Sequence, residues 1–434
     1  MTRTLIRARL LTFLGEPQGP DDHSSYRYEE DGAVLVDGGV ILNVGTYAEI
    51  APAAAGARVI DHRPHLLMPG FIDPHAHFPQ MQVIASYGAE LLTWLNTYTF
   101  PAESEFGDAD HAARIASAFL DEMVRQGTTT SAVYCTVHPQ SAEAFFAEAH
   151  RRNMRVLAGK VMMDRNAPEA LTDTPQSSYD DTKALIAKWH GKSRLHYAIT
   201  PRFAITSSPE QMEVAQALAA EHPDLHIQTH LSENHAEIAL SCELYPDCAD
   251  YTAIYEKYGL TGPKSLFGHC IHLSEREADA LSDSGSVAVF CPTSNLFLGS
   301  GMFDYFRYRR REGPLRIAMA TDTGGGTSYS MLRTMDEGYK VIASHGEKLN
   351  PLASFWQVTR GNAEALSLAH HIGTLEPGTD ADFVLLDANA TPAMRLRMER
   401  AKTLAEELFV LQTLGDDRAV VETYVAGKAV KGGL

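Results

Sequence analysis

The sequence of 434 residues has few cysteines, no long apolar run and a deficit of basic residues. Its five cysteines are scattered and form no CxxC pair, which argues against a disulfide framework and favours reduced thiols. No stretch approaches the roughly 18 uninterrupted apolar residues of a membrane span. Near the start of the chain, arginines interrupt the apolar residues before they reach the length of the apolar core of a signal peptide. We therefore expect a cytoplasmic protein that does not enter a membrane.

The charge balance bears on the class of partner. Lys and Arg number 37 against 55 Asp and Glu, which gives a net charge of −18 at pH 7. Nucleic acids and anionic membranes both require a basic face, so neither is an expected partner. We expect instead a small-molecule substrate that is neutral or is held by a local positive group.

The two ends of the chain differ from its middle. In both ends, short β-branched runs alternate with turns such as Asp-Gly and Gly-Gly, which is typical of β-hairpins. This composition predicts one small β-sandwich domain assembled from residues 1–67 and 372–434. A central domain, residues 68–371, is then inserted between the two parts.

The central region predicts a parallel (β/α)₈ barrel of the TIM type. Most of its short apolar runs are separated by amphipathic helical segments, such as residues 110–126 and 208–222. In such barrels the chemistry lies at the carboxyl ends of the strands. The eight predicted strand regions are 66–77, 127–135, 155–164, 195–204, 225–233, 264–273, 286–295 and 316–326.

Metal-binding residue types stand at the ends of four of these runs. The first run ends in His75 and His77, which share one face of a strand because they are two residues apart. A single histidine at a strand end is usually an ordinary hydrogen-bonded residue, but this joint placement predicts a site for one divalent ion. Imidazole with a carboxylate suits Zn²⁺ and is also compatible with Fe²⁺. The predicted ligands are His75, His77, His230, His269 and Asp322.

These motifs carry a resemblance to a known family. The set "PGFIDPHAH", "HLSE", "GHC" and "TD" resembles the amidohydrolase superfamily, metal-dependent hydrolases with a (β/α)₈ barrel and a small β-sandwich. Binuclear members carry a bridging carboxylated lysine on strand four, where this chain has "LHYAITPRFA" and no lysine. Lys160 is then a structural or solvated residue. The resemblance implies the mononuclear deaminase branch, with Glu233 as the proton shuttle.

Longer motifs narrow the resemblance to the guanine deaminase family. They include "HFPQ", "LLTWLNTYTFPAE", "TPRFA", "CPTSNLFLGSG" and "TDTGGGTSYSML". The resemblance implies hydrolysis of guanine to xanthine and ammonia in purine catabolism, one Zn²⁺ per subunit and a homodimer. It places Gln80, Arg202 and Phe203 at the purine. The metal-site residues His77, His230 and Asp322 are expected to contact the substrate as well.

The residue types suit that chemistry. A divalent ion makes water nucleophilic at neutral pH, and Glu233 can relay protons to a ring nitrogen and to the departing amine. Asp322 would accept a proton, and His269 would orient the nucleophile. Arg202 offers donors that fit the guanine O6 acceptor, whereas adenine presents a donor there. The alternative for Arg202 is a structural salt bridge to a surface carboxylate, and Phe203 could equally be core.

Other interpretations remain open at this point. A related enzyme could deaminate an aminotriazine, a pterin or cytosine with the same metal machinery, and a noncatalytic protein could retain the fold with a decayed site. His235 and Glu237 resemble the HxE of cytidine-type deaminases, but the PCxxC of that class is missing, so we expect both to be exposed helix residues. His272 is expected to be structural. The segment "TYTFPAE" is long enough to form a lid or a subunit contact, and "TGGGTS" is expected to be a loop that approaches the metal site closely.

Overall fold

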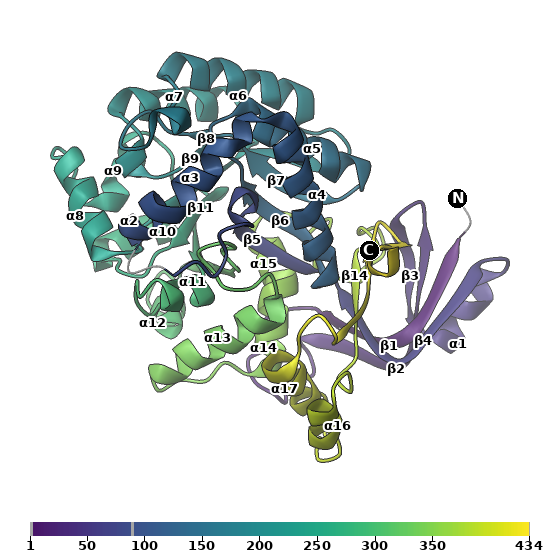
Figure 1. The fold of residues 1–434 in the computed structure, drawn as a ribbon. Coiled ribbons are helices and arrows are strands. Elements are labelled where there is room, and N and C mark those ends of the chain that lie inside the picture. The colour runs from purple at the N-terminus through teal and green to yellow at the C-terminus, as the bar shows by residue number, and fades with distance from the viewer. Residues whose placement is uncertain (1–2, 88–90, 434) are drawn as a thin grey trace.

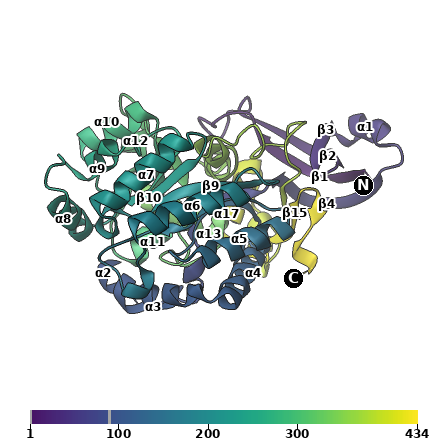
Figure 2. The same cartoon turned by 90° about the horizontal axis from the view of Figure 1, so that it is seen from above.

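A barrel and a separate sheet make up the molecule, a computed structural model that describes residues 3–87 and 91–433. Helices surround the barrel strands, and the sheet lies to one side of them (Figure 1). Seen from above, the first and last described strands lie in that same sheet (Figure 2). The arrangement is the predicted TIM-type barrel with a sheet built from the two chain ends.

The eight predicted barrel strands are all present and neighbouring strands run parallel. A short ninth strand, β8 (Val161–Met162), pairs with β9. The barrel strands are β5 (Phe71–His77), β6 (Thr128–Tyr134), β7 (Arg155–Gly159), β9 (Leu195–Pro201), β10 (His226–Leu231), β11 (Ser265–His269), β12 (Val287–Phe290) and β13 (Arg316–Met319). Almost every residue in them is buried, as expected where a parallel sheet is covered on both faces.

Helices follow the strands in the expected alternation. α4 (Ala109–Arg125) shows why they form: Asp108 caps its first turn by accepting two backbone N–H bonds, and its buried residues recur at helical spacing. The other barrel helices are α5 (Pro139–Arg151), α6 (Pro175–Trp189), α7 (Pro209–Glu221), α8 (His235–Leu244), α9 (Tyr251–Lys257), α10 (Glu275–Ser284), α11 (Pro292–Phe297), α12 (Tyr305–Arg310) and α13 (Met331–Ser344). α14 (Pro351–Trp356), α15 (Asn362–Ala365), α16 (Pro392–Met398) and α17 (Leu404–Leu414) lead toward the chain end.

Backbone hydrogen bonds join the last strand to the first. The Asp322 N–H donates to the His75 carbonyl at 2.9 Å, and the His77 N–H donates to the Thr323 carbonyl at 2.5 Å. The buried carboxylate of Asp73 accepts the Thr321 N–H at 3.0 Å. These bonds bring the carboxyl end of β13 against that of β5, so the residues that follow the two strands meet.

The separate sheet has seven strands in the order β16-β15-β14-β4-β1-β2-β3. Strand β4 pairs in parallel with β1 and antiparallel with β14, so it joins the two chain ends. The strands are β1 (Thr4–Phe13), β2 (Tyr26–Asp37), β3 (Val40–Thr46), β4 (Arg58–Pro69), β14 (Phe383–Leu386), β15 (Val420–Val425) and β16 (Lys428–Ala429), with α1 (Tyr47–Ile50) after β3. Apolar side chains from both ends, among them Ile6 and Phe383, share one buried cluster.

A buried charge network ties this sheet to the barrel. The Arg194 guanidinium, just before β9, donates to Asp380 at 2.9 Å and to Asp382 at 2.8 Å. Arg155 donates to Asp380 at 2.7 Å. Asp382 also accepts the Ala426 backbone N–H at 2.7 Å. The entry to β14 is therefore fixed to two barrel strands through paired charges.

The connection between β5 and α4 is unusually long. It contains a 3₁₀ turn at Phe78–Gln80, α2 (Leu91–Trp94), a π-helical turn at Leu95–Thr99 and α3 (Phe100–Glu103). Leu91, Trp94 and Leu95 of this segment line a pocket at the carboxyl ends of the strands. Across residues 3–87 and 91–433, no helix combines the length and the apolar character that a bilayer crossing needs.

Candidate active site

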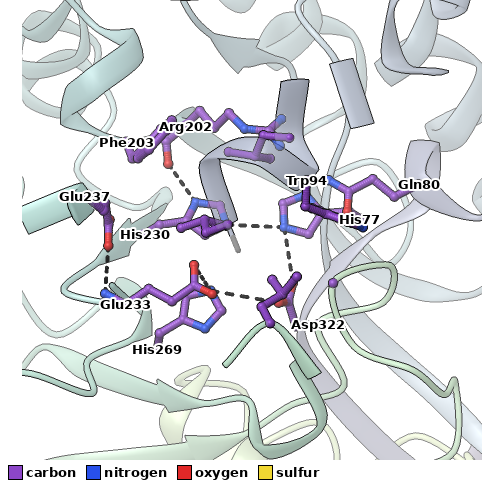
Figure 3. Close-up of a pocket in the computed structure, with 14 residues that line it drawn as sticks. His77, Gln80, Trp94, Arg202, Phe203, His230, Glu233, Glu237, His269 and Asp322 are labelled. Atoms are coloured by element: carbon purple, nitrogen blue, oxygen red, sulfur yellow. Dashed lines mark hydrogen bonds and ion pairs between the residues drawn. The ribbon is translucent and has the colours of Figure 1, made fainter. Parts of the chain in front are cut away.

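The structure brings together all five side chains predicted to hold a metal ion, and Figure 3 shows four of them, His77, His230, His269 and Asp322. His75 Nε2 and His77 Nε2 lie 3.3 and 3.4 Å from Asp322 Oδ1. His230 Nε2 lies 3.3 Å from His77 Nε2, and His269 Nε2 lies 3.8 Å from Asp322 Oδ2. Four imidazoles and one carboxylate therefore converge at the ends of β5, β10, β11 and β13.

Hydrogen bonds aim two of these imidazoles at the centre. The backbone carbonyl of Arg202 accepts from His230 Nδ1 at 2.7 Å, and the Asn295 side-chain oxygen accepts from His269 Nδ1 at 2.8 Å. Because each Nδ1 carries the proton for these bonds, each Nε2 presents a lone pair to the cluster. Both histidines therefore have the tautomer that a metal ion requires.

The cluster fits a divalent cation. Among the described residues, Nδ1 and Nε2 of His75 and Nδ1 of His77 are buried without a hydrogen-bond partner, a costly state for polar atoms unless a ligand uses them. Burial lowers the pKa of His77 to about 4 and that of His230 well below its ordinary value. Burial pushes the pKa of Asp322 up, but the adjacent His75 and His77 rings outweigh it and hold the pKa well below its ordinary value. Neutral imidazoles beside an ionised carboxylate are metal ligands.

The backbone at this site is unusual. His269, Asp322 and Ser232 adopt positive φ angles of 75°, 48° and 51°, which non-glycine residues rarely do outside sites where the surroundings enforce it. A Cβ atom on Gly268 would lie 2.7 Å from the His75 ring, so the ring packs where a side chain is missing. A Cβ atom on Gly324 would lie 2.7 Å from the carbonyl oxygen of Gln80. The "TGGGTS" loop, predicted to approach the site closely, therefore packs directly against the backbone of Gln80.

Glu233 lies beside the cluster and is 3% exposed. Its Oε2 is 3.3 Å from His269 Nε2, and its Oε1 accepts the Ser300 hydroxyl at 2.9 Å. Burial, with the charge of Asp322 adding to it, raises the pKa of Glu233 to about 8. A carboxyl in this state can both give and take a proton near neutral pH.

Glu237 corrects one expectation from the sequence. His235 is exposed as expected, but Glu237 is buried and lines the pocket. Its Oε2 accepts the backbone N–H groups of Glu233 and Asn234 at 2.8 and 3.0 Å. Since α8 begins at His235, Glu237 occupies the third helical position, where a capping side chain turns back to the helix start. It therefore fixes the backbone of Glu233.

Arg202 and Gln80 share a buried partner in Glu103. Arg202 donates to the two Glu103 oxygens at 3.0 and 2.7 Å, and the Gln80 side-chain nitrogen donates to Glu103 Oε1 at 2.9 Å. The alternative interpretation, a salt bridge from Arg202 to a surface carboxylate, is wrong because Glu103 is 1% exposed. Arg202 and Gln80 both line the pocket.

The pocket extends from the cluster to an apolar wall. Phe203 lines it, with its ring centroid 6.2 Å from that of His230. The lining residues are His77, Gln80, Leu91, Trp94, Leu95, Arg202, Phe203, His230, Glu233, Glu237, His269, Leu298, Asp322 and Gly325. A lining that combines the aromatic side chains of Trp94 and Phe203 with several polar groups suits a planar polar heterocycle.

Two further residues have the structural roles that the sequence left open. Lys160 is fully buried and ion-paired with Asp173, so it is structural and not solvated. His272 contacts the Ser300 carbonyl at 2.8 Å through Nε2 and so supports the residue that hydrogen-bonds Glu233.

Several pocket residues were not identified from the sequence. Trp94 and Leu95, which line the pocket, lie in the motif "LLTWLNTYTFPAE". Ser300 and Asn295, which hydrogen-bond Glu233 and His269, lie in "CPTSNLFLGSG". Those two motifs were the available signal. Nothing in the spacing connects Glu103 with Arg202, which lies 99 positions later in the chain.

Comparisons with known proteins agree with this geometry. The model of the amidohydrolase family matches residues 66–430. Guanine deaminase of Escherichia coli (strain K12) is 46% identical over 408 residues, which cover 94% of this chain and 92% of the relative. A solved structure of E. coli guanine deaminase superposes with a TM-score of 0.96 at 44% identity, covering 98% of this chain and 99% of that one.

A second solved structure, guanine deaminase from C. acetobutylicum with guanine bound in the active site, matches with a TM-score of 0.88 at 29% identity. The match covers 99% of this chain and all of that one (100%). The family match spans most of the chain, and the similarity to the solved structures covers both the barrel and the sheet. The chain therefore belongs to the amidohydrolase family.

Proposed function

We propose that the protein hydrolyses guanine to xanthine and ammonia. One observation carries this assignment: the buried carboxyl of Glu233 adjoins the histidine cluster in a pocket that also contains Arg202 and Gln80. Glu233 and the histidine cluster supply the means of hydrolysing an aryl amine. Arg202 and Gln80 supply hydrogen bonds for an oxo-purine. The guanine deaminases that match the chain over nearly its whole length support the same reaction.

The proposed metal ligands are His75, His77, His230, His269 and Asp322, with one Zn²⁺ per subunit. Zn²⁺ bound there would supply a Lewis acid that makes water nucleophilic at neutral pH. The same ligand set is compatible with Fe²⁺. His269 orients the attacking water in this scheme, since Asn295 holds its ring on one side and Glu233 lies on the other.

Glu233 is the proposed proton shuttle. Of the two hydrogens of water, one must reach ring nitrogen N3 and the other must leave with the amine as ammonia. Glu233 takes one proton from the attacking water and delivers it to N3. Asp322 accepts the other, which returns through Glu233 to the departing amine, so both carboxyl groups end as they began. Ser300 and Glu237 hold the side chain and the backbone of Glu233 during these transfers.

Substrate recognition is assigned to the opposite part of the pocket. Guanidinium N–H groups of Arg202 fit the O6 acceptor, and Gln80 meets the neighbouring edge of the ring. Phe203 contacts a ring face, while His77, His230 and Asp322 bound the reacting carbon.

Guanine turnover by the zinc-loaded protein tests this function. We expect loss of guanine absorbance, appearance of xanthine and release of one ammonia per guanine. Adenine, which presents a donor where guanine has O6, serves as the matched control and is expected to react at least about 10⁴-fold more slowly. Absence of guanine turnover by metal-replete protein would refute the proposal.

Metal removal is expected to destabilise the folded protein. A ligand that binds only the native state at 100-fold above its Kd contributes about 2.7 kcal/mol, so the melting temperature should fall by several degrees after chelation and return when Zn²⁺ is added. Calorimetry of chelated and reloaded protein, with metal content measured by mass spectrometry, checks this. A melting temperature independent of metal would contradict binding at the cluster.

The assembly and the cellular setting are also proposals. We propose a cytoplasmic homodimer that acts in purine catabolism, and a division into a composite domain of residues 1–67 plus 372–434 and a catalytic domain of residues 68–371. The five free cysteines support a reducing compartment. Strand β4, which ends at Pro69, and β14, which starts at Phe383, support boundaries between the sheet and the barrel.

A further inference from the structure

A buried carboxylate, Glu103, lies behind the part of the pocket assigned to recognition. It comes from α3, in the long connection after β5, and is 1% exposed. It is not among the residues that line the pocket, but its hydrogen-bond partners Arg202 and Gln80 are. Any effect of Glu103 on a bound ring must therefore pass through these two side chains.

Helix α3 holds the Arg202 guanidinium in two ways. Both Glu103 oxygens accept hydrogen bonds from Nη1, at 3.0 and 2.7 Å. The Arg202 Cζ atom also lies 5.5 Å from the centre of the Phe100 ring on the same helix, within the range of a cation–π contact. With Nη1 committed to Glu103, other N–H groups of the guanidinium remain for a ring oxygen.

The same carboxylate decides how Gln80 is oriented. An ionised carboxylate only accepts hydrogen bonds, so the amide group of Gln80 must face it with the NH₂ group. The 2.9 Å bond from Gln80 Nε2 to Glu103 Oε1 has this direction. The carbonyl oxygen of Gln80 lies in the same amide plane but points away from Glu103, and it can only accept.

The result is a fixed pair of complementary groups, donors on Arg202 and an acceptor on Gln80. A ring edge with C=O next to N–H, as at O6 and N1 of guanine, matches this pair. An edge with an amine next to an unprotonated nitrogen, as in 2,6-diaminopurine, opposes it at both positions. We propose that Glu103 is a positioning residue, an inference that rests on the proposed function. By fixing Arg202 and Gln80, Glu103 makes the pocket selective for aminated rings with a lactam edge, that is, a C=O next to an N–H.

The selectivity between guanine and 2,6-diaminopurine tests this inference, because both rings carry the reactive amine at C2. The wild-type protein should prefer guanine in kcat/KM by roughly 10⁴-fold. In the Glu103→Gln variant the new amide can donate as well as accept, so the side-chain amide of Gln80 can rotate and exchange the places of its oxygen and nitrogen. We expect the preference to fall by at least about 10-fold, mainly through a higher KM for guanine.

Glu105→Gln is the matched control, since it makes the same change two residues later at an exposed position and should leave the preference intact. Glu103→Asp is a second variant if Glu103→Gln does not fold: it keeps the charge opposite Arg202, while its shorter side chain should lose the Gln80 bond and lower the preference. Equal losses for both substrates would overturn the inference and leave the function standing. Failure of the wild-type protein to convert guanine would instead refute the function itself.

Discussion

Glu233→Gln is expected to lower kcat for guanine by about 10³-fold or more, because proton transfer by a positioned side chain typically contributes 10²- to 10⁴-fold. An amide of the same shape can still meet the Ser300 hydroxyl but cannot carry a proton to N3 or to the amine. Metal content and melting temperature should stay close to those of the wild-type protein. Steady-state kinetics with metal analysis of the same preparation provide the measurement.

The control for this variant is Glu243→Gln, the same substitution at an exposed position of α8. It should retain wild-type kinetics. If Glu233→Gln kept activity within about 10-fold of the wild type while binding its full complement of metal, the shuttle would have to be another group. Glu237 would then be the next candidate, because it is buried in the same pocket.

Arg194→Met is expected to reduce the free energy of unfolding by about 3–5 kcal/mol, because it leaves the buried carboxylate of Asp382 without its guanidinium partner. Asp382 loses its 2.8 Å bond from Arg194, while Asp380 retains Arg155. Urea unfolding followed by circular dichroism measures the change. Arg418→Met, which removes an exposed ion pair with Asp416, is the control and should cost no more than about 1 kcal/mol.

The destabilisation by Arg194→Met should also depend on pH. Burial already raises the pKa of Asp382 above its ordinary value, even though Arg194 opposes the shift. Loss of Arg194 raises the folded-state pKa further, and a group with a raised pKa loses stabilisation as the pH rises through that value. The difference from wild type should therefore be larger at pH 8 than at pH 5. A difference that does not change with pH would show that Asp382 is not the stranded charge.

Much of the architecture could be predicted because each barrel strand is a local pattern. A buried parallel strand needs a short continuous apolar run, and the helix after it needs polar and apolar residues at helical spacing. The ends of those runs then indicated the ligands, since parallel strands place their carboxyl ends together. For His75 and His77, the spacing alone placed both side chains on one face of β5.

The sequence was wrong about Glu237 and undecided about Lys160, and in both cases the side chain turns against the local pattern. Glu237 follows an exposed histidine in a polar segment, which favours a solvated position, but the capping geometry of α8 turns it into the pocket. Lys160 is buried because Asp173, 13 residues later, returns to meet it. Neither partner could be inferred from composition, because each contact depends on where a loop returns.

The sequence by itself determined the barrel order and the candidate ligand residues, since these depend on positions that the strand pattern fixes, and its motifs carried the resemblance that implies deamination. Only the tertiary structure decided how the site is supported. It brought Glu103 to Arg202 and Gln80 across 99 and 23 positions, and Ser300 to Glu233 across 67. The physical reason is that a buried hydrogen bond between distant segments depends on the path of the whole chain, and a local pattern carries no information about that path.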